Sequence, residues 1–155
     1  MNRDLMFSNK NNAWCTPRDF FNKLNLEFNF TLDPCCMPKS ALCSKYYTPL
    51  EDGLKQDWGG EIVFVNPPYG KQISKWVEKS YLESLKPNTI VVMLIPSRTD
   101  TRYFHNFIYN KSEIRFLKGR LKFIDMDFEG REEDRKLSPA PFPSMLVIFK
   151  SNLNQ

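Results

Sequence analysis

Apolar blocks separated by polar turns recur along the chain and predict alternating strands and helices. Residues 62–65 and 89–95 are unbroken apolar runs, which are typical of strands buried on both faces. Between them, apolar residues recur every three or four positions over about 71–86 and predict a helix closed by Pro87 and Asn88. The order of strand, helix and strand predicts an α/β fold with a mostly parallel sheet.

The N-terminal part of the chain predicts a further helix and strand. Thr16 and Pro17 are typical of a helix start, as N-cap and first helical residue. Apolar and polar residues then alternate over 28–32, which predicts a strand that ends at Asp33. A short strand is predicted over 45–47.

The C-terminal part predicts an antiparallel edge of the sheet. Residues 113–117 and 120–124 read as two strands of a hairpin that turns at Gly119. Residues 126–143 are charged and then proline-rich, so we expect a long loop that is mobile in the free protein. A last strand is predicted over 144–150.

Composition supports one domain. The chain has 155 residues, of which 41% are hydrophobic and 14% aromatic, enough for one sizeable core. We expect a single domain over 14–155 after a flexible, Asn-rich arm over 1–13. Because no apolar run approaches the length of a membrane span and no signal segment is recognisable, we expect a cytoplasmic protein without a membrane anchor.

The cysteines do not predict a metal site. Cys15, Cys35, Cys36 and Cys43 lack the paired spacing of zinc ligands, and His105 is distant in sequence. We therefore expect free thiols and no metal.

The candidate chemistry lies at Asn66-Pro67-Pro68-Tyr69, which ends the apolar run 62–65. Ligands of open α/β sheets bind at the carboxyl ends of strands. The Asn66 side-chain oxygen and the Pro67 carbonyl can accept the hydrogens of a planar exocyclic amine, and the prolines hold both acceptors in place. Tyr69 offers a face on which a flipped base can stack. The grouping indicates methyl transfer, with neutral Asn66 acting by orientation rather than as a base; the alternative is a rigid turn that only ends a strand.

Carboxylates at other turns are candidates for binding a cofactor. Asp33-Pro34 forms a second polar strand end, and Asp52 and Asp57 lie in turns where they can accept hydrogen bonds from a ribose or an adenine amine. Asp and Gly also favour turns without any ligand. Residues 35–40 contain no glycine, so the usual dinucleotide-binding fingerprint is absent.

Positive charge is concentrated in one stretch. Between Arg98 and Lys122 there are seven basic residues against two acidic ones, whereas the whole chain has a net charge of only +4. This distribution suits a phosphate backbone, and the alternative is a basic but merely solvated surface. The candidate contacts are Arg98, Arg102, Lys118, Arg120 and Lys122.

Several blocks in one order give the chain a resemblance to the phage-type Dam DNA adenine-N6 methyltransferases. The resemblance covers most of the chain, from Trp14 to Phe149, and rests on residues 14–17, 30–35, 66–70, 96–101, 119–123 and 140–144. It implies a Rossmann-like methyltransferase fold of reduced size, encoded by a phage or prophage and active in a bacterial host cell.

The resemblance also implies roles for individual residues. Asn66, Pro67, Pro68 and Tyr69 would hold the target adenine, flipped out of double-stranded DNA. The residues that match the segments binding S-adenosylmethionine are Trp14, Thr16, Pro17, Asp33 and Pro34. Either Asp52 or Asp57 would contact the cofactor's adenosine, and we favour Asp57.

Phe142 occupies the position where related adenine methyltransferases bring an aromatic ring to the flipped base. We expect the loop 126–143 to close over DNA so that Phe142 covers the adenine opposite Tyr69. The alternative is that Phe142 caps the core.

Two other functions are compatible with the central motif. Similar motifs serve enzymes that methylate protein glutamine or guanine in ribosomal RNA. A catalytically weak DNA-binding module of the same fold is the third possibility, because the glycines after Asp33 are missing.

Overall fold

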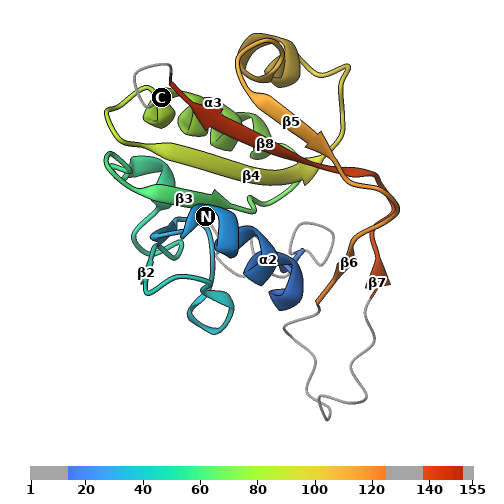
Figure 1. Cartoon of the computed structure of the whole chain (residues 1–155), viewed down its shortest axis with the longest axis horizontal. Helices are drawn as coiled ribbons and strands as arrows, with labels where there is room; N and C mark the ends of the chain where they lie inside the picture. The colour runs from blue at the N-terminus through green and yellow to red at the C-terminus, as the bar shows by residue number, and fades with distance from the viewer. Residues whose placement is uncertain (1–13, 125–137, 152–155) are drawn as a thin grey trace.

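The computed structural model describes residues 14–124 and 138–151 (Figure 1). The elements in chain order are α2 (Arg18–Phe28), β1 (Leu32–Asp33), η1 (Pro38–Ser40), β2 (Lys45–Tyr46), η2 (Gly53–Lys55), β3 (Ile62–Val65), α3 (Ile73–Ser84), β4 (Ile90–Pro96), the π-helix η3 (Phe104–Ile108), β5 (Glu113–Phe116), β6 (Lys122–Phe123), β7 (Ser138–Pro139) and β8 (Ser144–Lys150). The arm expected over 1–13 and most of the loop expected over 126–143 lie outside the described residues.

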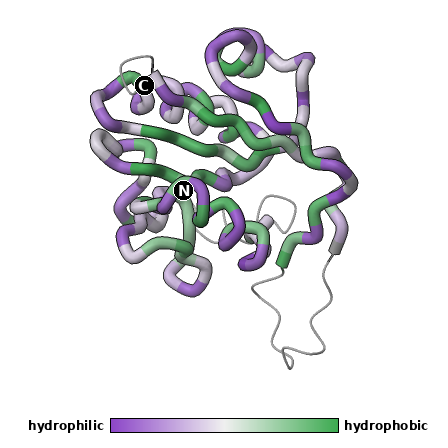
Figure 2. Tube along the Cα trace, viewed as in Figure 1, coloured by the Kyte–Doolittle hydropathy of each residue, from purple (hydrophilic) through white to green (hydrophobic). Residues whose placement is uncertain are grey.

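The predicted α/β class with a mostly parallel sheet is confirmed. Six strands form one sheet in the order β2-β1-β3-β4-β8-β5. Strands β2, β1, β3 and β4 pair in parallel, and β8 lies antiparallel between β4 and β5. Figure 2 shows the hydrophobic stretches running along β3, β4 and β8.

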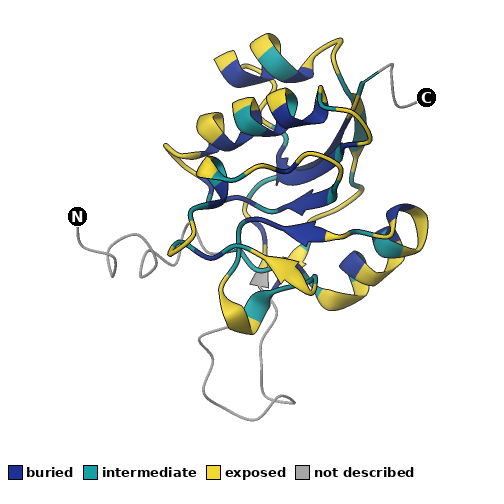
Figure 3. Cartoon of the chain, turned by 90° about the vertical axis from the view of Figure 1, so that its left-hand side faces the viewer, coloured by how far each residue is buried: buried dark blue, intermediate teal, exposed yellow. Residues whose placement is uncertain are grey.

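Helices cover both faces of the sheet. On one face, the Phe64 ring of β3 packs against Phe21 of α2, with centroids 5.3 Å apart. On the other, the Phe149 ring of β8 lies 6.1 Å from Tyr81 of α3. The cross-strand partners of Phe64 and Phe149 are adjacent residues of β4, so the two rings point to opposite faces. This double cover explains the apolar sequence of β4, and Figure 3 shows the central strands of the sheet in dark blue, as buried.

The strand order places the site. From β1 the chain moves to β2 on one side, and then to β3 on the other side of β1. Ligands of such sheets bind beyond the carboxyl ends of the strands that flank this reversal. Those strands pair at Leu32 and Val63, so Asp33 and Asn66 follow at neighbouring ends.

The strand predicted over 28–32 is wrong except at its end. Helix α2 continues to Phe28, and Asn29 ends it with a left-handed φ of 57°. Only Leu32 and Asp33 form β1. The rings of Phe28 and Phe30 stack at 5.4 Å. A helix end and the turn after it therefore bury alternate residues in one cluster, and this mimics the period of a strand.

The N-cap predicted at Thr16 is also wrong. The helix begins at Arg18 with Pro17 as its N-cap residue, and no side chain caps it. The Thr16 hydroxyl bonds instead to the Asn66 side chain.

The hairpin predicted around Gly119 does not form. Strand β5 pairs with β8, matching Ile114 with Val147, whereas β6 pairs with β7 in a separate two-stranded sheet. Strand β5 adds to the free side of β8 as the outermost strand of the main sheet, and its residues stay half-buried or exposed. Ser138 and Pro139 form β7, although the sequence predicts a loop over 126–143.

Membrane-spanning helices, metal sites and cysteines can be checked across the described residues. No helix in the described ranges is long and apolar enough to cross a membrane. The same residues contain no group of three or more side chains able to hold a metal ion. All four cysteines are free thiols.

Candidate active site

Asn66 follows β3 and its amide group is held on both sides. Its Nδ2 donates hydrogen bonds to the Trp14 carbonyl and to Thr16 Oγ1, the latter over 3.0 Å. Its Oδ1 accepts a hydrogen bond from the Tyr69 hydroxyl over 2.8 Å. Because a backbone carbonyl can only accept, the contact with Trp14 determines which end of the amide is nitrogen. The orientation that the predicted role needs, with the oxygen available to an amine, is the one present.

The Tyr69 hydroxyl has two acceptors but only one proton. It lies 2.8 Å from Asn66 Oδ1 and 3.1 Å from the Leu94 carbonyl. Burial raises the pKa of Tyr69 well above its usual range, so the hydroxyl stays protonated at neutral pH. By turning its proton to Leu94, the hydroxyl can leave Asn66 Oδ1 free without moving the ring.

Four aromatic rings gather around the motif. Phe142 meets Tyr69 and Trp14 edge to face, with centroids 5.5 and 5.6 Å apart. Phe123 lies 5.5 Å from Trp14 and 6.4 Å from Tyr69. Tyr69 is only 5% exposed, so a base can stack on it only after a neighbouring ring moves. Sequence reasoning did not assign Phe123 to the site, although it lies in the block 119–123.

Asp33 lies at the end of β1 and is buried. Its two carboxylate oxygens accept backbone hydrogen bonds from Cys35 over 3.3 Å and from Leu42 over 3.1 Å. Burial raises its pKa to about 6, although the two N–H groups partly offset the effect. Asp33 therefore closes the loop 34–42 and places a buried carboxylate at the switch point.

Gly53 supplies the close backbone approach that residues 35–40 lack. A Cβ at Gly53 would lie 2.0 Å from the Pro34 carbonyl oxygen, so only glycine fits there. The buried Trp58 indole donates to the Gly53 carbonyl over 2.9 Å and holds this turn. Asp52 is thereby brought to the β1 end. Its charge adds to burial and to the charge of Asp33 in raising the pKa of the Cys35 thiol.

Asp57 lies at the opposite end of the strands, before the start of β3. Its exposed carboxylate precedes β3 and pairs with Lys86 over 2.8 Å. Of the two candidate aspartates, the structure thus brings Asp52 to Asp33 and Pro34, contrary to the preference for Asp57.

A cavity of about 290 Å³ lies beside the motif. It is lined by Tyr69, Gly70, Ile73, Pro96, Arg98, Thr101 and Tyr103. Arg98 is the only charged residue of the lining, so the cavity suits a polar or anionic group. Neither Asp33 nor Thr16 lines it.

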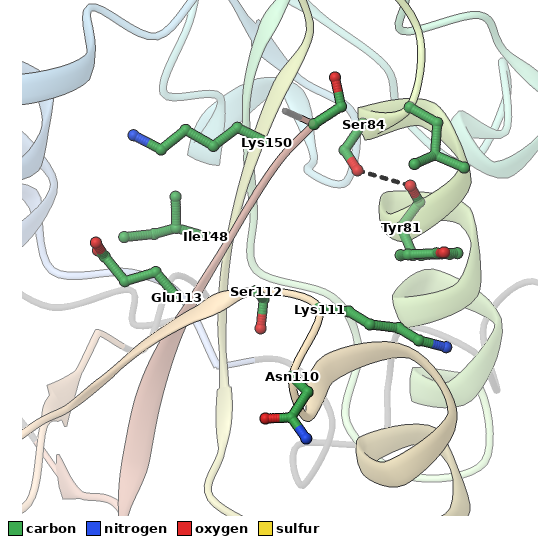
Figure 4. Close-up of a pocket in the computed structure, with 10 residues that line it drawn as sticks. Tyr81, Ser84, Asn110, Lys111, Ser112, Glu113, Ile148 and Lys150 are labelled. Carbon is green, nitrogen blue, oxygen red and sulfur yellow. Dashed lines mark hydrogen bonds between the residues drawn. The ribbon is translucent and has the colours of Figure 1, made fainter. Parts of the chain in front are cut away.

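A larger cavity, of about 470 Å³, lies at the opposite edge of the sheet (Figure 4). It contains none of the predicted site residues. Lys111 lines it, donates to the Asn106 carbonyl over 2.7 Å and lies over the Tyr81 ring. Size therefore does not identify the site.

The five basic residues proposed for DNA are exposed, and none forms an ion pair with another residue of 14–124 or 138–151. Arg115, from the same stretch, does form ion pairs. Its guanidinium bonds Glu27 through both terminal nitrogens over 2.8 Å and Glu113 over 2.7 Å. Like most lysines and arginines of the described ranges, the side chains of Arg98, Arg102, Lys118, Arg120 and Lys122 are not neutralised by an ion pair and can meet a partner.

A mostly parallel sheet with a neutral asparagine amide near its switch point, in a chain with exposed cations, is typical of an α/β enzyme that acts on a nucleic acid. Residues 5–154 match the family of DNA N-6-adenine-methyltransferases (Dam). The chain therefore belongs to this family, and it is an adenine-specific DNA methyltransferase.

Two individual relatives bear the same name as the family. The chain is 31% identical over 140 residues to the DNA N-6-adenine-methyltransferase of Haemophilus phage HP1 (strain HP1c1), covering 88% of this chain and 78% of that protein. Identity to the DNA N-6-adenine-methyltransferase of Escherichia phage T1 is 29% over 124 residues, covering 79% of this chain and 50% of that protein. A putative methyltransferase from Thermoplasma acidophilum aligns with a TM-score of 0.40 and 10% identity, over 92% of this chain and 68% of that one.

Among the three functions left open by the sequence, the family decides for adenine in DNA.

Proposed function

We propose that this chain methylates adenine N6 in double-stranded DNA, and that Asn66 and Pro67 capture the amine. The amine nitrogen is a poor nucleophile because its lone pair is delocalised into the ring. Hydrogen bonds from its two hydrogens to Asn66 Oδ1 and the Pro67 carbonyl draw it toward tetrahedral geometry. The observation that carries the proposal is the fixed amide of Asn66, whose nitrogen is held by Trp14 and Thr16 and whose oxygen meets only a displaceable hydroxyl.

The methyl donor in this proposal is S-adenosylmethionine, which when bound supplies a methyl group on a positively charged sulfur. The residues that would hold it are Trp14, Pro17, Asp33, Pro34 and Asp52, whereas the Thr16 hydroxyl is directed at Asn66. The fit rests on Asp33, because a buried carboxylate with a pKa near 6 is stabilised by a nearby cation. Asp57 is left out because Lys86 already neutralises it at the other edge.

DNA binding in this proposal uses the five unpaired cations. Arg98 lines the cavity next to Tyr69, so it lies where the phosphate of an extruded nucleotide would approach. Displacement of half-buried Phe142 would open the Tyr69 ring to the base, after which Phe142 would cover the base from the other side. Pro68 keeps the turn rigid. The site of action would be the cytoplasm of a phage host, where DNA and methyl donor are available.

The proposal is tested by incubating the purified chain with S-adenosylmethionine labelled on the methyl group. Double-stranded DNA, single-stranded DNA, ribosomal RNA and protein are offered as acceptors at equal concentration. We expect label in double-stranded DNA, released as N6-methyladenine on nucleoside digestion. Label chiefly in single-stranded DNA would contradict the double-stranded substrate, and absence of cofactor binding by calorimetry would contradict the donor.

A further inference from the structure

An asparagine that captures an amine must present its oxygen and not its nitrogen. The side-chain amide can rotate by half a turn, which exchanges the two, at little cost unless its neighbours differ. Reversal would aim N–H groups at the target amine, which also donates. Whatever orients the Asn66 amide therefore controls catalysis.

The structure gives this task to the segment just before α2. The Trp14 carbonyl and Thr16 Oγ1 both accept from Asn66 Nδ2. Thr16 is only 8% exposed, so water cannot readily replace its hydroxyl. Of these contacts, the Trp14 carbonyl can only accept and so selects the orientation, whereas the hydroxyls of Thr16 and Tyr69 can either donate or accept. Thr16 Oγ1 is the second acceptor for Nδ2 and holds the amide in that place.

Thr16 is placed for this contact rather than for the helix. Its sequence context, before Pro17, predicts an N-cap, yet α2 begins at Arg18 without a side-chain cap. The hydroxyl that could have stabilised the helix start is directed at Asn66 instead.

The segment is anchored independently of Asn66. Cys15 pairs with Ile124, whose N–H donates to the Cys15 carbonyl over 3.1 Å. The Trp14 ring packs against Phe123 and Phe142. Both orienting acceptors therefore sit on backbone held by β6 and by the aromatic cluster.

We propose that Thr16 is a positioning residue, whose hydroxyl holds the Asn66 amide in place while the Trp14 carbonyl sets which end of the amide is nitrogen. This inference rests on the proposed role of Asn66 as amine acceptor. It assigns the Thr16 hydroxyl to turnover rather than to cofactor affinity. Segment 14–16 thus links the cofactor side of the site to the amine side.

The test compares Thr16→Val, which keeps the shape of threonine but removes the acceptor, with Thr16→Ser, which keeps the hydroxyl. Single-turnover methylation is measured at saturating S-adenosylmethionine and DNA, and cofactor affinity is measured by calorimetry. We expect Thr16→Val to slow the single-turnover step by about ten-fold, within the range known for misplaced groups. The rate of Thr16→Ser should stay within about two-fold of the wild-type rate. Cofactor affinity should stay equally close to the wild type in both variants, because the substitutions change the contact with Asn66 and not the cofactor.

Thr89→Val is the matched control. The Thr89 hydroxyl is equally buried and accepts a backbone hydrogen bond from Gly60 over 2.8 Å, but it lies at the opposite edge of the sheet. It should lower the melting temperature without slowing the single-turnover step. If Thr16→Val does not fold, Thr16→Ala gives the same measurement.

A second experiment separates the hold on Asn66 from any other role of Thr16. Without the amide there is nothing for the Thr16 hydroxyl to hold, so Thr16→Val should cost much less rate in an Asn66→Ala background than in the wild type. An equal cost in both backgrounds, or weaker cofactor binding with an unchanged rate, overturns the inference. Undiminished activity of Asn66→Ala would instead refute the proposed site itself, so the two failures are distinguishable.

Discussion

Buried polar groups are satisfied differently at the two ends of the parallel strands, which we call the amino edge, where the strands begin, and the carboxyl edge, where they end. At the amino edge, Glu83 is 5% exposed, accepts the Trp58 N–H over 2.6 Å, and lies 2.6 Å from Lys86 and 3.4 Å from Lys79. Burial raises the pKa of Glu83, but the hydrogen bonds from Lys86 and Trp58 and the nearby charges outweigh it and hold the pKa below its usual value. The charges of this edge are neutralised within the protein.

At the carboxyl edge the groups are left ready for a partner. Asn66 is neutral, Asp33 is buried without a cation among its hydrogen-bonding partners, and Arg98 has no ion pair among the described residues. An edge that only stabilises the fold can satisfy every charge internally. An edge that binds a polyanion and a cationic donor must leave some charges unsatisfied, at a cost in stability.

The largest effect should come from Asn66→Ala. Removal of one preorganised hydrogen-bonding group at a reacting centre costs about 10²–10³-fold in rate. We expect that loss in methylation, with cofactor binding and melting temperature close to those of the wild type. Activity near the wild-type level would mean that Asn66 only ends a strand.

A matched substitution at the amino edge should lower stability and leave activity unchanged. Glu83→Ala removes a buried charge from a hydrogen-bonded network and should lower the free energy of unfolding by about 3 kcal/mol, with full activity per folded molecule. For a chain of this size this corresponds to a fall of about 6–12 °C in melting temperature. Glu78→Ala, an exposed residue on the same helix, should change stability by less than about 0.5 kcal/mol.

The sequence is sufficient to place Asn66 and Asp33 at the carboxyl ends of strands, but not to predict their hydrogen-bonding partners. Asn66 and Asp33 stand out because a polar residue before proline ends an apolar strand. The Thr16 hydroxyl could not be assigned, because a helix start and a side chain some fifty residues away compete for it. The sequence does not distinguish the places of Asp52 and Asp57, because a turn sequence does not state at which end of the strands it lies.

The errors in the fold have a common cause. The strand over 28–32 and the hairpin at Gly119 were inferred from local patterns, and in both cases a distant partner determined the outcome. Phe30 packs against Phe64 of β3 with ring centroids 5.3 Å apart, and β5 pairs with a strand about thirty residues further along. Local periodicity is therefore least reliable where short elements bury against a long one.

A third prediction uses the raised pKa of the Asp33 carboxyl group. Its pKa is about 6 in the folded protein against 3.8 for an exposed aspartate, so the folded state binds the proton more tightly. Its stabilising contribution is therefore present below about pH 4 and is lost as the pH rises through 6. The loss amounts to about 3 kcal/mol, at ~1.4 kcal/mol per pKa unit.

Urea unfolding of the wild type and of Asp33→Asn between pH 4 and pH 7 measures this. The difference between the two proteins should shift in favour of Asp33→Asn as the pH rises. A constant difference would show that Asp33 titrates normally. Saturating S-adenosylmethionine should shrink the shift if its positive charge lies near Asp33.

A smaller effect is expected from the unpaired cations. If Lys118 and Arg120 contact phosphates, the Lys118→Ala, Arg120→Ala double variant should reduce the slope of log affinity against log salt by ~1.8, at ~0.9 per contact. Arg115→Ala is the control, because Glu27 and Glu113 already neutralise that guanidinium. Equal slopes for the double variant and the wild type would assign the basic stretch to solvent.

The smallest and most finely balanced effect concerns Phe142. Its ring is half-buried and touches Trp14 and Tyr69 edge to face, contacts worth about 0.5–1.5 kcal/mol each beyond the buried area. We expect Phe142→Ala to slow methylation by about ten-fold or more, because the base loses its cover. The melting temperature should fall by only a few degrees, at about 2–4 °C per kcal/mol.

Two variants make the Phe142 measurement decisive. Phe142→Tyr keeps a ring and should restore methylation, whereas Phe149→Ala removes a ring that is only 1% exposed and should cost about 3–5 kcal/mol of stability. If Phe142→Ala behaves like Phe149→Ala, with a large fall in melting temperature and normal activity per folded molecule, Phe142 belongs to the core. The carboxyl edge would then close over the base with some other residue.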